Sequence, residues 1–170
     1  RMGASLVAAH PYAGVWHAAG VLADGVLPRQ SCVTCARVYA PKAHGAWSLH
    51  STSASSCLRA CALFSSVAAL LGGAGQANYS AANQCLDALA AHRVTRGYRS
   101  VSVQWGAWAE IGMASRGAAS ARMAAIEQAA GLARIGVAQG LGALHVAVLP
   151  RAPAVLAMLP VQWHRMLGGG

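Results

Sequence analysis

The chain alternates short, continuous apolar runs with longer segments that carry apolar residues at helical spacing. Short apolar runs bounded by glycine, proline or polar residues indicate strands that are buried on both faces. The pattern predicts strands at residues 15–19, 60–65, 100–105 and 153–159. It predicts helices at residues 30–50, 78–93, 120–130 and 138–148. We expect a bend at Pro41, because proline lacks the backbone N–H that a helix interior requires.

The second predicted helix, residues 78–93, shows the clearest stripe. Its apolar positions are Ala81, Ala82, Cys85, Leu86 and Leu89. The segment ends in His92 and Arg93, and basic side chains suit the negative end of a helix dipole.

The order of elements is strand, helix, strand, helix, strand, two helices, strand. Apolar strands separated by helices predict an α/β fold, with a parallel sheet covered on both faces. In such folds ligands bind outside the carboxyl ends of the strands. The residues that follow the predicted strands, and therefore belong to a candidate site, are 17–20, 65–66, 105–108 and 159–161.

Composition narrows the class of protein. Alanine contributes 40 residues and glycine 19, the broad hydrophobic set makes up 56%, and only 10% of the 170 residues are charged. These values exclude a disordered chain, and the glycines lack the period of three that collagen requires. No apolar stretch reaches the roughly 18–20 residues that a membrane span needs, so we expect no membrane association.

The net charge of +9 suggests nucleic-acid binding as one alternative. However, the arginines are scattered, and Arg93, Arg96 and Arg99 form the only short cluster. We therefore expect no nucleic-acid partner. An acidic protein partner or a phosphorylated cofactor accounts for the charge equally well.

Five cysteines and the absence of a signal-peptide pattern favour a reducing, cytoplasmic location over a disulfide framework. Cys32 and Cys35 have the spacing of a zinc half-site, and Cys57 with Cys61 offers a second pair. We favour structural cysteines and no metal, because the second pair approaches a buried strand, where cysteine serves as a small hydrophobic residue.

One set of polar residues has a specific spacing. Ser66 closes a predicted strand, Tyr79 follows thirteen residues later at the start of a helix, and Asn83 lies four residues beyond Tyr79 on the same helix face. The only lysine, Lys42, precedes Ser66 by 24 residues.

These residues resemble the active site of ketoreductase domains of modular polyketide synthases, a branch of the short-chain dehydrogenase/reductase superfamily. The resemblance covers residues 10–166. Its motifs are residues 17–22 (HAAGVL), 42–50 (KAHGAWSLH), 64–83 (FSSVAALLGGAGQANYSAAN), 86–93 (LDALAAHR), 104–108 (QWGAW) and 156–163 (LAMLPVQW). Ordinary members of the superfamily carry Tyr-x-x-x-Lys. Here Asn83 takes the place of that lysine, and Lys42 lies upstream, as is typical of polyketide and fatty-acid synthase ketoreductases. This exchange disfavours the alternative of a free-standing reductase.

The resemblance implies NADPH-dependent reduction of a β-ketoacyl thioester and a role for each residue. Tyr79 is the implied proton donor, and Lys42 lowers its pKa and holds the nicotinamide ribose. Ser66 hydrogen-bonds the substrate carbonyl, Asn83 positions a water or the lysine, and Gly20 lets the backbone approach the cofactor. The implied cofactor-binding residues are Ala19, Gly20, Lys42, Tyr79, Trp105, Gly106 and Trp108.

The amino-terminal part of such a domain is not found in this sequence. No strand with a Gly-x-Gly-x-x-Gly turn precedes His17. We therefore expect residues 1–166 to form the carboxyl-terminal half of a Rossmann-like, doubly wound parallel sheet, with residues 167–170 as a glycine-rich tail. We expect this half to be inactive in isolation. The alternative to a catalytic role is a non-catalytic structural subdomain or an inactive fragment of a synthase.

The resemblance also bears on partners and stereochemistry. It implies an acyl carrier protein and other synthase domains as partners, with a β-ketoacyl group as substrate. Residues 22–24 (LAD) resemble the Leu-Asp-Asp motif of B-type ketoreductases, with Asp24 retained and Ala23 in place of the first aspartate. Leu71 stands where the other class usually carries tryptophan. Both positions favour the B-type outcome.

Overall fold

The computed structural model describes residues 13–53, 58–110 and 127–168. A four-stranded parallel sheet lies at its centre, in the order β1-β2-β3-β4. The strands are β1 (Gly14–His17), β2 (Ala60–Ser66), β3 (Val101–Trp105) and β4 (Val155–Met158). The helices are η1 (Leu27–Arg29), α1 (Cys32–Tyr39), η2 (Ala40–His44), α2 (Gly45–Ser53), α3 (Ala68–Leu71), α4 (Ala77–Thr95), α6 (Val137–Ala147) and α7 (Trp163–Met166).

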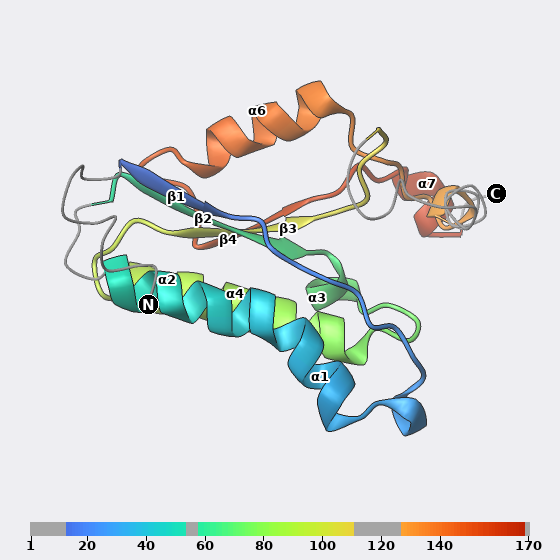
Figure 1. Ribbon diagram of the computed structural model, residues 1–170. Helices are drawn as coiled ribbons and strands as arrows, with labels where there is room; N and C mark the ends of the chain where they lie inside the picture. The colour runs from blue at the N-terminus through green and yellow to red at the C-terminus, as the bar shows by residue number, and fades with distance from the viewer. Residues whose placement is uncertain (1–12, 54–57, 111–126, 169–170) are drawn as a thin grey trace.

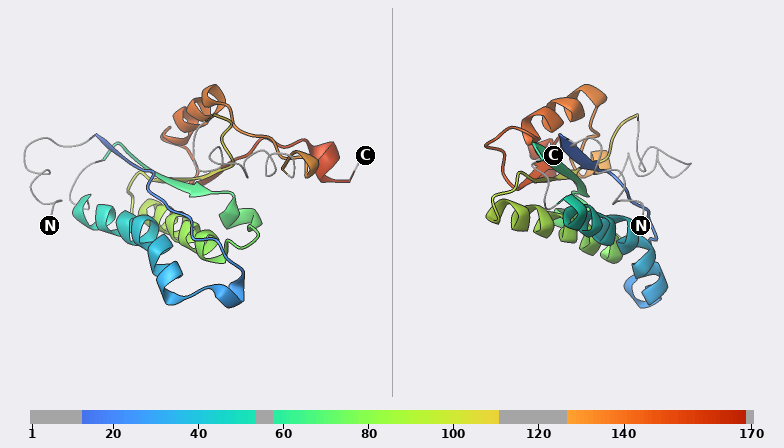
Figure 2. Two further views of the ribbon diagram at one scale, coloured as in Figure 1. Left: turned by 45° about the vertical axis from the view of Figure 1, so that its right-hand side comes forward. Right: turned by 60° about the vertical axis from the view of Figure 1, so that its left-hand side comes forward.

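Helices cover both faces of the sheet. Helix α6 lies on one face, and α2 and α4 lie on the other, with α1 leading through η2 into the start of α2 (Figures 1 and 2). Residues of β3 alternate between the two layers. Val101, Val103 and Trp105 pack in the core cluster that includes residues of α6. Ser102 and Gln104 bond to α4. The predicted α/β fold with a covered parallel sheet is confirmed.

Several predicted boundaries needed correction. Strand β1 ends at His17, two residues before the predicted end, because the chain leaves the sheet where the His17 ring bonds to the Lys42 carbonyl (Nε2 to O, 3.2 Å). Strand β4 spans only the centre of its predicted segment. Of the predicted helix at 120–130, residues 127–129 are helical, residue 130 is a turn, and the rest lies outside the described residues.

The predicted bend at Pro41 is a π-helical turn. Helix α1 begins after Ser31, which forms a capping box with Thr34. At η2 the Gly45 N–H reaches back five residues to the Ala40 carbonyl. Proline cannot donate to the helical ladder, so the widened turn accommodates it without ending the helix. The turn places Lys42 in the buried layer between the helices and the sheet.

Helix α4 packs against β2 through the apolar face that the sequence predicts, with one correction. Leu86, Leu89 and Ala90 are buried in the cluster that includes Cys61 of β2. Cys85 is exposed, although the predicted stripe included it. None of the described helices is both long enough and apolar enough to cross a lipid bilayer.

Candidate active site

The predicted catalytic residues converge near the carboxyl end of β2. Ser66 is the last residue of β2, Tyr79 and Asn83 lie in the first two turns of α4, and Lys42 lies in η2. Helix α4 packs against both η2 and β2. The four residues, spread over 42 positions of the sequence, therefore surround one edge of the sheet.

Lys42 is a buried cation held at a defined point. Its side chain is 3% exposed, and its Nζ donates a hydrogen bond to the Phe64 carbonyl at 3.0 Å. The same Nζ lies 5.3 Å from the centre of the Tyr79 ring. Burial disfavours the charged ammonium and lowers the pKa of Lys42 to about 8, against an opposing effect of the Asp87 carboxylate.

Tyr79 is itself buried, with 7% of its surface exposed. Burial raises the pKa of its phenol above the usual 10, and the side chains of Asn83 and Ser66 oppose that shift. The pKa of Tyr79 is therefore raised on balance, and the effect of Lys42 on it stays a prediction. Loss of solvent around the charged phenolate is the largest cause of the shift. Tyr79 consequently keeps its proton at neutral pH, as a proton donor must.

Asn83 is fully buried beside the tyrosine. Its Nδ2 donates to the Tyr79 carbonyl at 2.8 Å, while its Oδ1 has no hydrogen-bond partner among the described residues. The Ser65 hydroxyl is buried and donates to the Asn83 carbonyl at 3.3 Å. The Ser66 hydroxyl is half-buried and accepts from the Ala68 N–H at 3.2 Å. Of the two serines, Ser66 is the less buried.

The residues near Lys42 fit a nicotinamide ribose. Gly20 follows β1, and a Cβ built on it would lie 3.0 Å from Lys42 Cε and 3.4 Å from Nζ. The missing side chain thus lets the Lys42 side chain pack directly against the backbone at Gly20. Ala19, the preceding residue, is exposed. A cationic donor, a phenol and open backbone form a suitable donor set for a hydroxyl-rich sugar.

The three predicted cofactor contacts at and after the end of β3 have packing contacts in the structure. The Trp105 ring centre lies 5.5 Å from that of Phe64 and 5.1 Å from that of Trp108. A Cβ on Gly106 would lie 2.7 Å from a methyl carbon of Leu159. These contacts account for Trp105, Gly106 and Trp108 within the core, so their contact with a cofactor stays a prediction.

The two predicted stereocontrol residues lie on segments next to the catalytic helix. The Asp24 carboxylate accepts from Gln76 Nε2 at 3.1 Å, which ties the loop after β1 to the start of α4. Buried Asn78 reinforces this link by donating to the Ala23 carbonyl at 2.9 Å. Leu71 is half-exposed at the end of α3.

The sequence analysis did not single out Gln76, Asn78 or Asp87. Asp87 is detectable in principle, because it continues the four-residue spacing of Tyr79 and Asn83 along α4.

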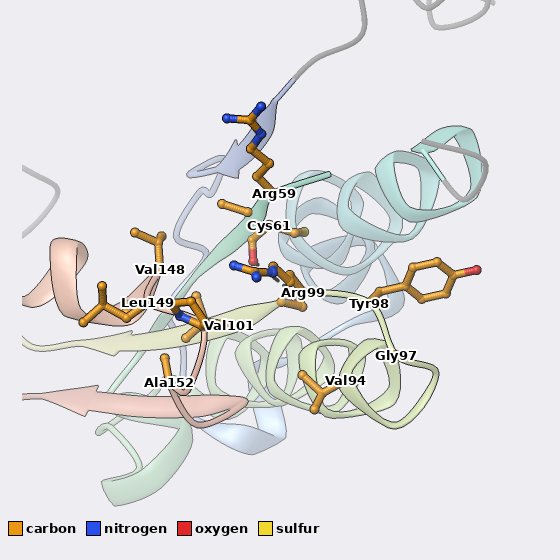
Figure 3. A pocket seen from close by; sticks show the side chains of 14 residues that line it. Arg59, Cys61, Val94, Gly97, Tyr98, Arg99, Val101, Val148, Leu149 and Ala152 are labelled. Atoms are coloured by element: carbon orange, nitrogen blue, oxygen red, sulfur yellow. Dashed lines mark hydrogen bonds between the residues drawn. The ribbon is translucent and has the colours of Figure 1, made fainter. Parts of the chain in front are cut away.

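A cavity of about 220 Å³ lies away from this site, at the amino ends of β2 and β3. Figure 3 shows Arg59 and Arg99 at this cavity, with Val94, Val101 and Leu149 among its apolar lining residues. Both arginines are exposed. Among the described residues, no buried polar atom that lacks a partner belongs to its lining.

The cysteines in the described part of the chain differ in burial. Cys61 is buried in the core, whereas Cys32 is exposed on α1. Cys57 lies outside the described residues. Within residues 13–53, 58–110 and 127–168, no three side chains of metal-ligand type form a group that could hold an ion.

Comparison with known proteins decides the family. A family model described as "KR domain" matches residues 3–110, which is more than half of the chain. The chain belongs to the ketoreductase family. This confirms the resemblance that the motifs indicated.

Related sequences are polyketide synthases. Polyketide synthase GfsB of Streptomyces halstedii is 52% identical over 120 residues, covering 71% of this ketoreductase chain and 2% of the synthase. The spectinabilin polyketide synthase system protein NorB of Streptomyces orinoci is 42% identical over 161 residues, covering 95% of the chain and 7% of that protein.

Solved structures agree. The ketoreductase from the first module of phoslactomycin biosynthesis in Streptomyces sp. HK803 has a TM-score of 0.86 and 35% identity, covering 98% of this ketoreductase and 38% of that chain. A short-chain dehydrogenase from Streptomyces avermitilis shares the fold, with a TM-score of 0.71, 18% identity and coverage of 92% and 64%. The ketoreductase chain thus spans a small part of its synthase relatives and little more than a third of the solved ketoreductase.

Proposed function

We propose that this chain carries the catalytic residues of a ketoreductase that reduces a β-ketoacyl thioester on an acyl carrier protein to the β-hydroxyacyl form. The proposed hydride donor is NADPH. The arrangement of Lys42 and Tyr79 is the observation that carries this proposal. A buried ammonium lies 5.3 Å from the centre of a buried tyrosine ring, at the carboxyl edge of a parallel sheet.

NADPH would be held by the backbone at Ala19 and Gly20 and by the side chains of Lys42 and Tyr79, and when bound it supplies a hydride to the ketone carbon. The close approach of the Lys42 side chain to the backbone at Gly20 supports this assignment.

In this mechanism the side chains of the chain orient the substrate and deliver the proton. Ser66 and Tyr79 hydrogen-bond the substrate carbonyl oxygen and fix its orientation. As negative charge develops on that oxygen, the Tyr79 hydroxyl transfers its proton and completes the alcohol. The Lys42 ammonium then stabilises the phenolate that remains. Asn83, whose Oδ1 has no described partner, orients a water that returns a proton from solvent.

Charge supports a carrier-protein partner. The net charge of +9 would attract an acidic carrier protein and speed its encounter with the ketoreductase. Because related proteins are multidomain synthases, we propose that other synthase domains accompany this chain.

The test of function uses what we call the joined ketoreductase. This is the native polypeptide from the start of its nucleotide-binding half through Gly170 of this chain. Sequencing the coding region before Arg1 supplies that half, and an upstream frame without a strand, glycine-rich turn and helix would contradict the proposal. We expect the joined protein to oxidise NADPH with a β-ketothioester and the 170-residue chain alone to show no turnover.

Tyr79→Phe tests the catalytic assignment in the joined ketoreductase. Removing the phenolic hydroxyl should lower kcat by about 10²- to 10⁴-fold, because the proton donor is lost while the ring packing is kept. Tyr98→Phe is the matched control, since Tyr98 is exposed beyond the end of α4. It should retain activity within about twofold, in keeping with small effects of surface substitutions. Near-normal turnover by Tyr79→Phe would refute the proton-donor role.

Stereochemistry is a separate proposal. Asp24 and Leu71 favour the B-type hydroxyl configuration, which chiral chromatography of the product of the joined ketoreductase measures. A product of the opposite configuration would show that neither residue decides the class in this protein, without affecting the assignment of Tyr79.

A further inference from the structure

A buried carboxylate lies behind the catalytic residues of α4. Tyr79, Asn83 and Asp87 follow one another at intervals of four residues, and all three are buried. Helical geometry places Asp87 about 12 Å along the axis from Tyr79, on the same face. Asp87 is 6% exposed, so its charge is largely shielded from solvent.

Neutral groups of β3 hold this carboxylate in place. Ser102 Oγ donates to Oδ1 at 2.6 Å, and Gln104 Nε2 donates to Oδ2 at 2.8 Å. No arginine, lysine or histidine in the described part of the chain forms an ion pair with Asp87. Burying a carboxylate without a contacting cation is costly, even with two good donors. A packing role alone could be filled by a neutral side chain of the same shape.

The buried cation held on the neighbouring strand is Lys42. Its Nζ bonds to the carbonyl of Phe64 in β2. Phe64 pairs with Val103 of β3, which lies between the two residues that hold Asp87. Lys42 is buried, bonds to the Phe64 carbonyl, and also makes no ion pair in the described residues. Neutral groups bind both the Asp87 carboxylate and the Lys42 ammonium, and both charges lie in the layer between the sheet and α4. Their interaction acts through a medium of low polarity, where charges are felt over longer distances than in water.

We propose that Asp87 is a positioning residue of the active site, whose buried negative charge keeps the Lys42 ammonium protonated during catalysis. This inference rests on the proposed function. Asp87 touches neither Tyr79 nor Lys42 in any described contact, so it acts through Lys42 and is not itself a catalytic residue.

The titratable groups around Lys42 are few. The pKa of Lys42 is lowered by burial, and Asp87 is the group that opposes this. His17 of β1 bonds to the Lys42 carbonyl, and burial lowers its pKa, so it is neutral at pH 7 and above. Tyr79 of α4 has a raised pKa and is likewise neutral, with Asp24 from the loop after β1 acting on Tyr79. Asp87 is thus the described anion that acts on Lys42.

Asp87→Asn in the joined ketoreductase removes the charge and keeps the shape. Both hydrogen bonds can be retained, because Ser102 still donates to the amide oxygen and the Gln104 amide can turn to accept from the new NH2 group. Loss of a charge at this range lowers the pKa of Lys42 by about one pH unit, from about 8. The pH at which kcat/KM falls on the alkaline side should decrease by the same interval, about one pH unit. The ratio of kcat/KM at pH 6 to that at pH 8.5 should rise by about eightfold over wild type.

Ser102→Ala is the control, since it removes the 2.6 Å hydrogen bond and leaves the charge. This variant should lower the unfolding temperature without changing the pH at which kcat/KM falls on the alkaline side. The double variant Asp87→Ser with Ser102→Asp returns a carboxylate to the same contact from the opposite side and should restore that pH to its wild-type value. This variant also tests the proposal if Asp87→Asn does not fold.

A second readout is independent of turnover. Urea unfolding measured from pH 6 to 10 reports the titration of buried Lys42 through the rise of stability with pH. In Asp87→Asn that rise should begin about one pH unit lower than in wild type. The role of Asp87 would be overturned if Asp87→Asn left two quantities unchanged. These are the pH at which kcat/KM falls on the alkaline side and the pH at which the stability to urea begins to rise. An inactive wild-type protein whose stability still shows the shift would overturn the proposed function and leave the electrostatic link intact.

Discussion

The buried lysine makes the stability of the fold depend on pH in a way that one substitution removes. Lys42→Met keeps the length of an unbranched side chain and deletes the ammonium. The folded pKa of Lys42 is about 8, compared with 10.5 for the exposed side chain. Between these values the unfolded chain holds a proton that the folded chain has released, so the stability of wild type rises with pH.

The size of this effect follows from the two pKa values. Each pKa unit corresponds to about 1.4 kcal/mol, so a difference of 2.5 units amounts to roughly 3 kcal/mol between pH 7 and pH 10.5. Lys42 is 3% exposed, and solvent therefore screens little of it. At neutral pH the charged lysine destabilises the fold by that amount. Lys42→Met removes this penalty but also loses the hydrogen bond to the Phe64 carbonyl, which costs about 1–3 kcal/mol.

The assay is equilibrium unfolding of the joined ketoreductase, followed by tryptophan fluorescence at pH values from 6.5 to 10. Other titrating groups contribute equally to both proteins, so the informative quantity is wild-type stability minus Lys42→Met stability. We expect this difference to increase by about 2–3 kcal/mol over the range. Parallel stability curves for the two proteins would refute the reasoning, because they would mean that Lys42 titrates alike in the folded and unfolded chains.

Three further outcomes are expected in the joined ketoreductase. Gly20→Ala places a Cβ 3.0 Å from Lys42 Cε and should lower kcat/KM several-fold with little change in unfolding temperature, as steady-state kinetics and a thermal melt would show. Gly140→Ala drives a Cβ into the Trp108 ring and should cost about 1–3 kcal/mol in urea unfolding. Gly142→Ala, two residues along the same helix with open space around it, should be neutral or stabilising by up to about 1 kcal/mol. Equal gains in stability in Gly140→Ala and Gly142→Ala would mean that helix propensity, and not packing on Trp108, decides the result.

Local pattern predicted the four strands and the longer helices in their order, and the resemblance of the motifs predicted the family. Strand and helix periodicity is a property of neighbouring residues, and the parallel sheet follows from their alternation. The positions of Tyr79 and Asn83 on one helix face follow from helical spacing alone. Pro41 marked the π-helical turn because its missing N–H is a covalent property of the residue.

Only the tertiary structure decided which residues are buried. Because burial shifts pKa values, it also decided the electrostatics of the site. The pKa of Tyr79 is raised because the phenol loses solvent, and that loss comes from segments distant in the chain. Asp87 receives its two hydrogen bonds from Ser102 and Gln104, fifteen and seventeen residues further along. Trp105 packs between Phe64 and Trp108, contacts that a motif cannot distinguish from cofactor binding. Residue type and spacing are local and can be read in sequence, whereas desolvation and charge interactions depend on every group that the fold brings near.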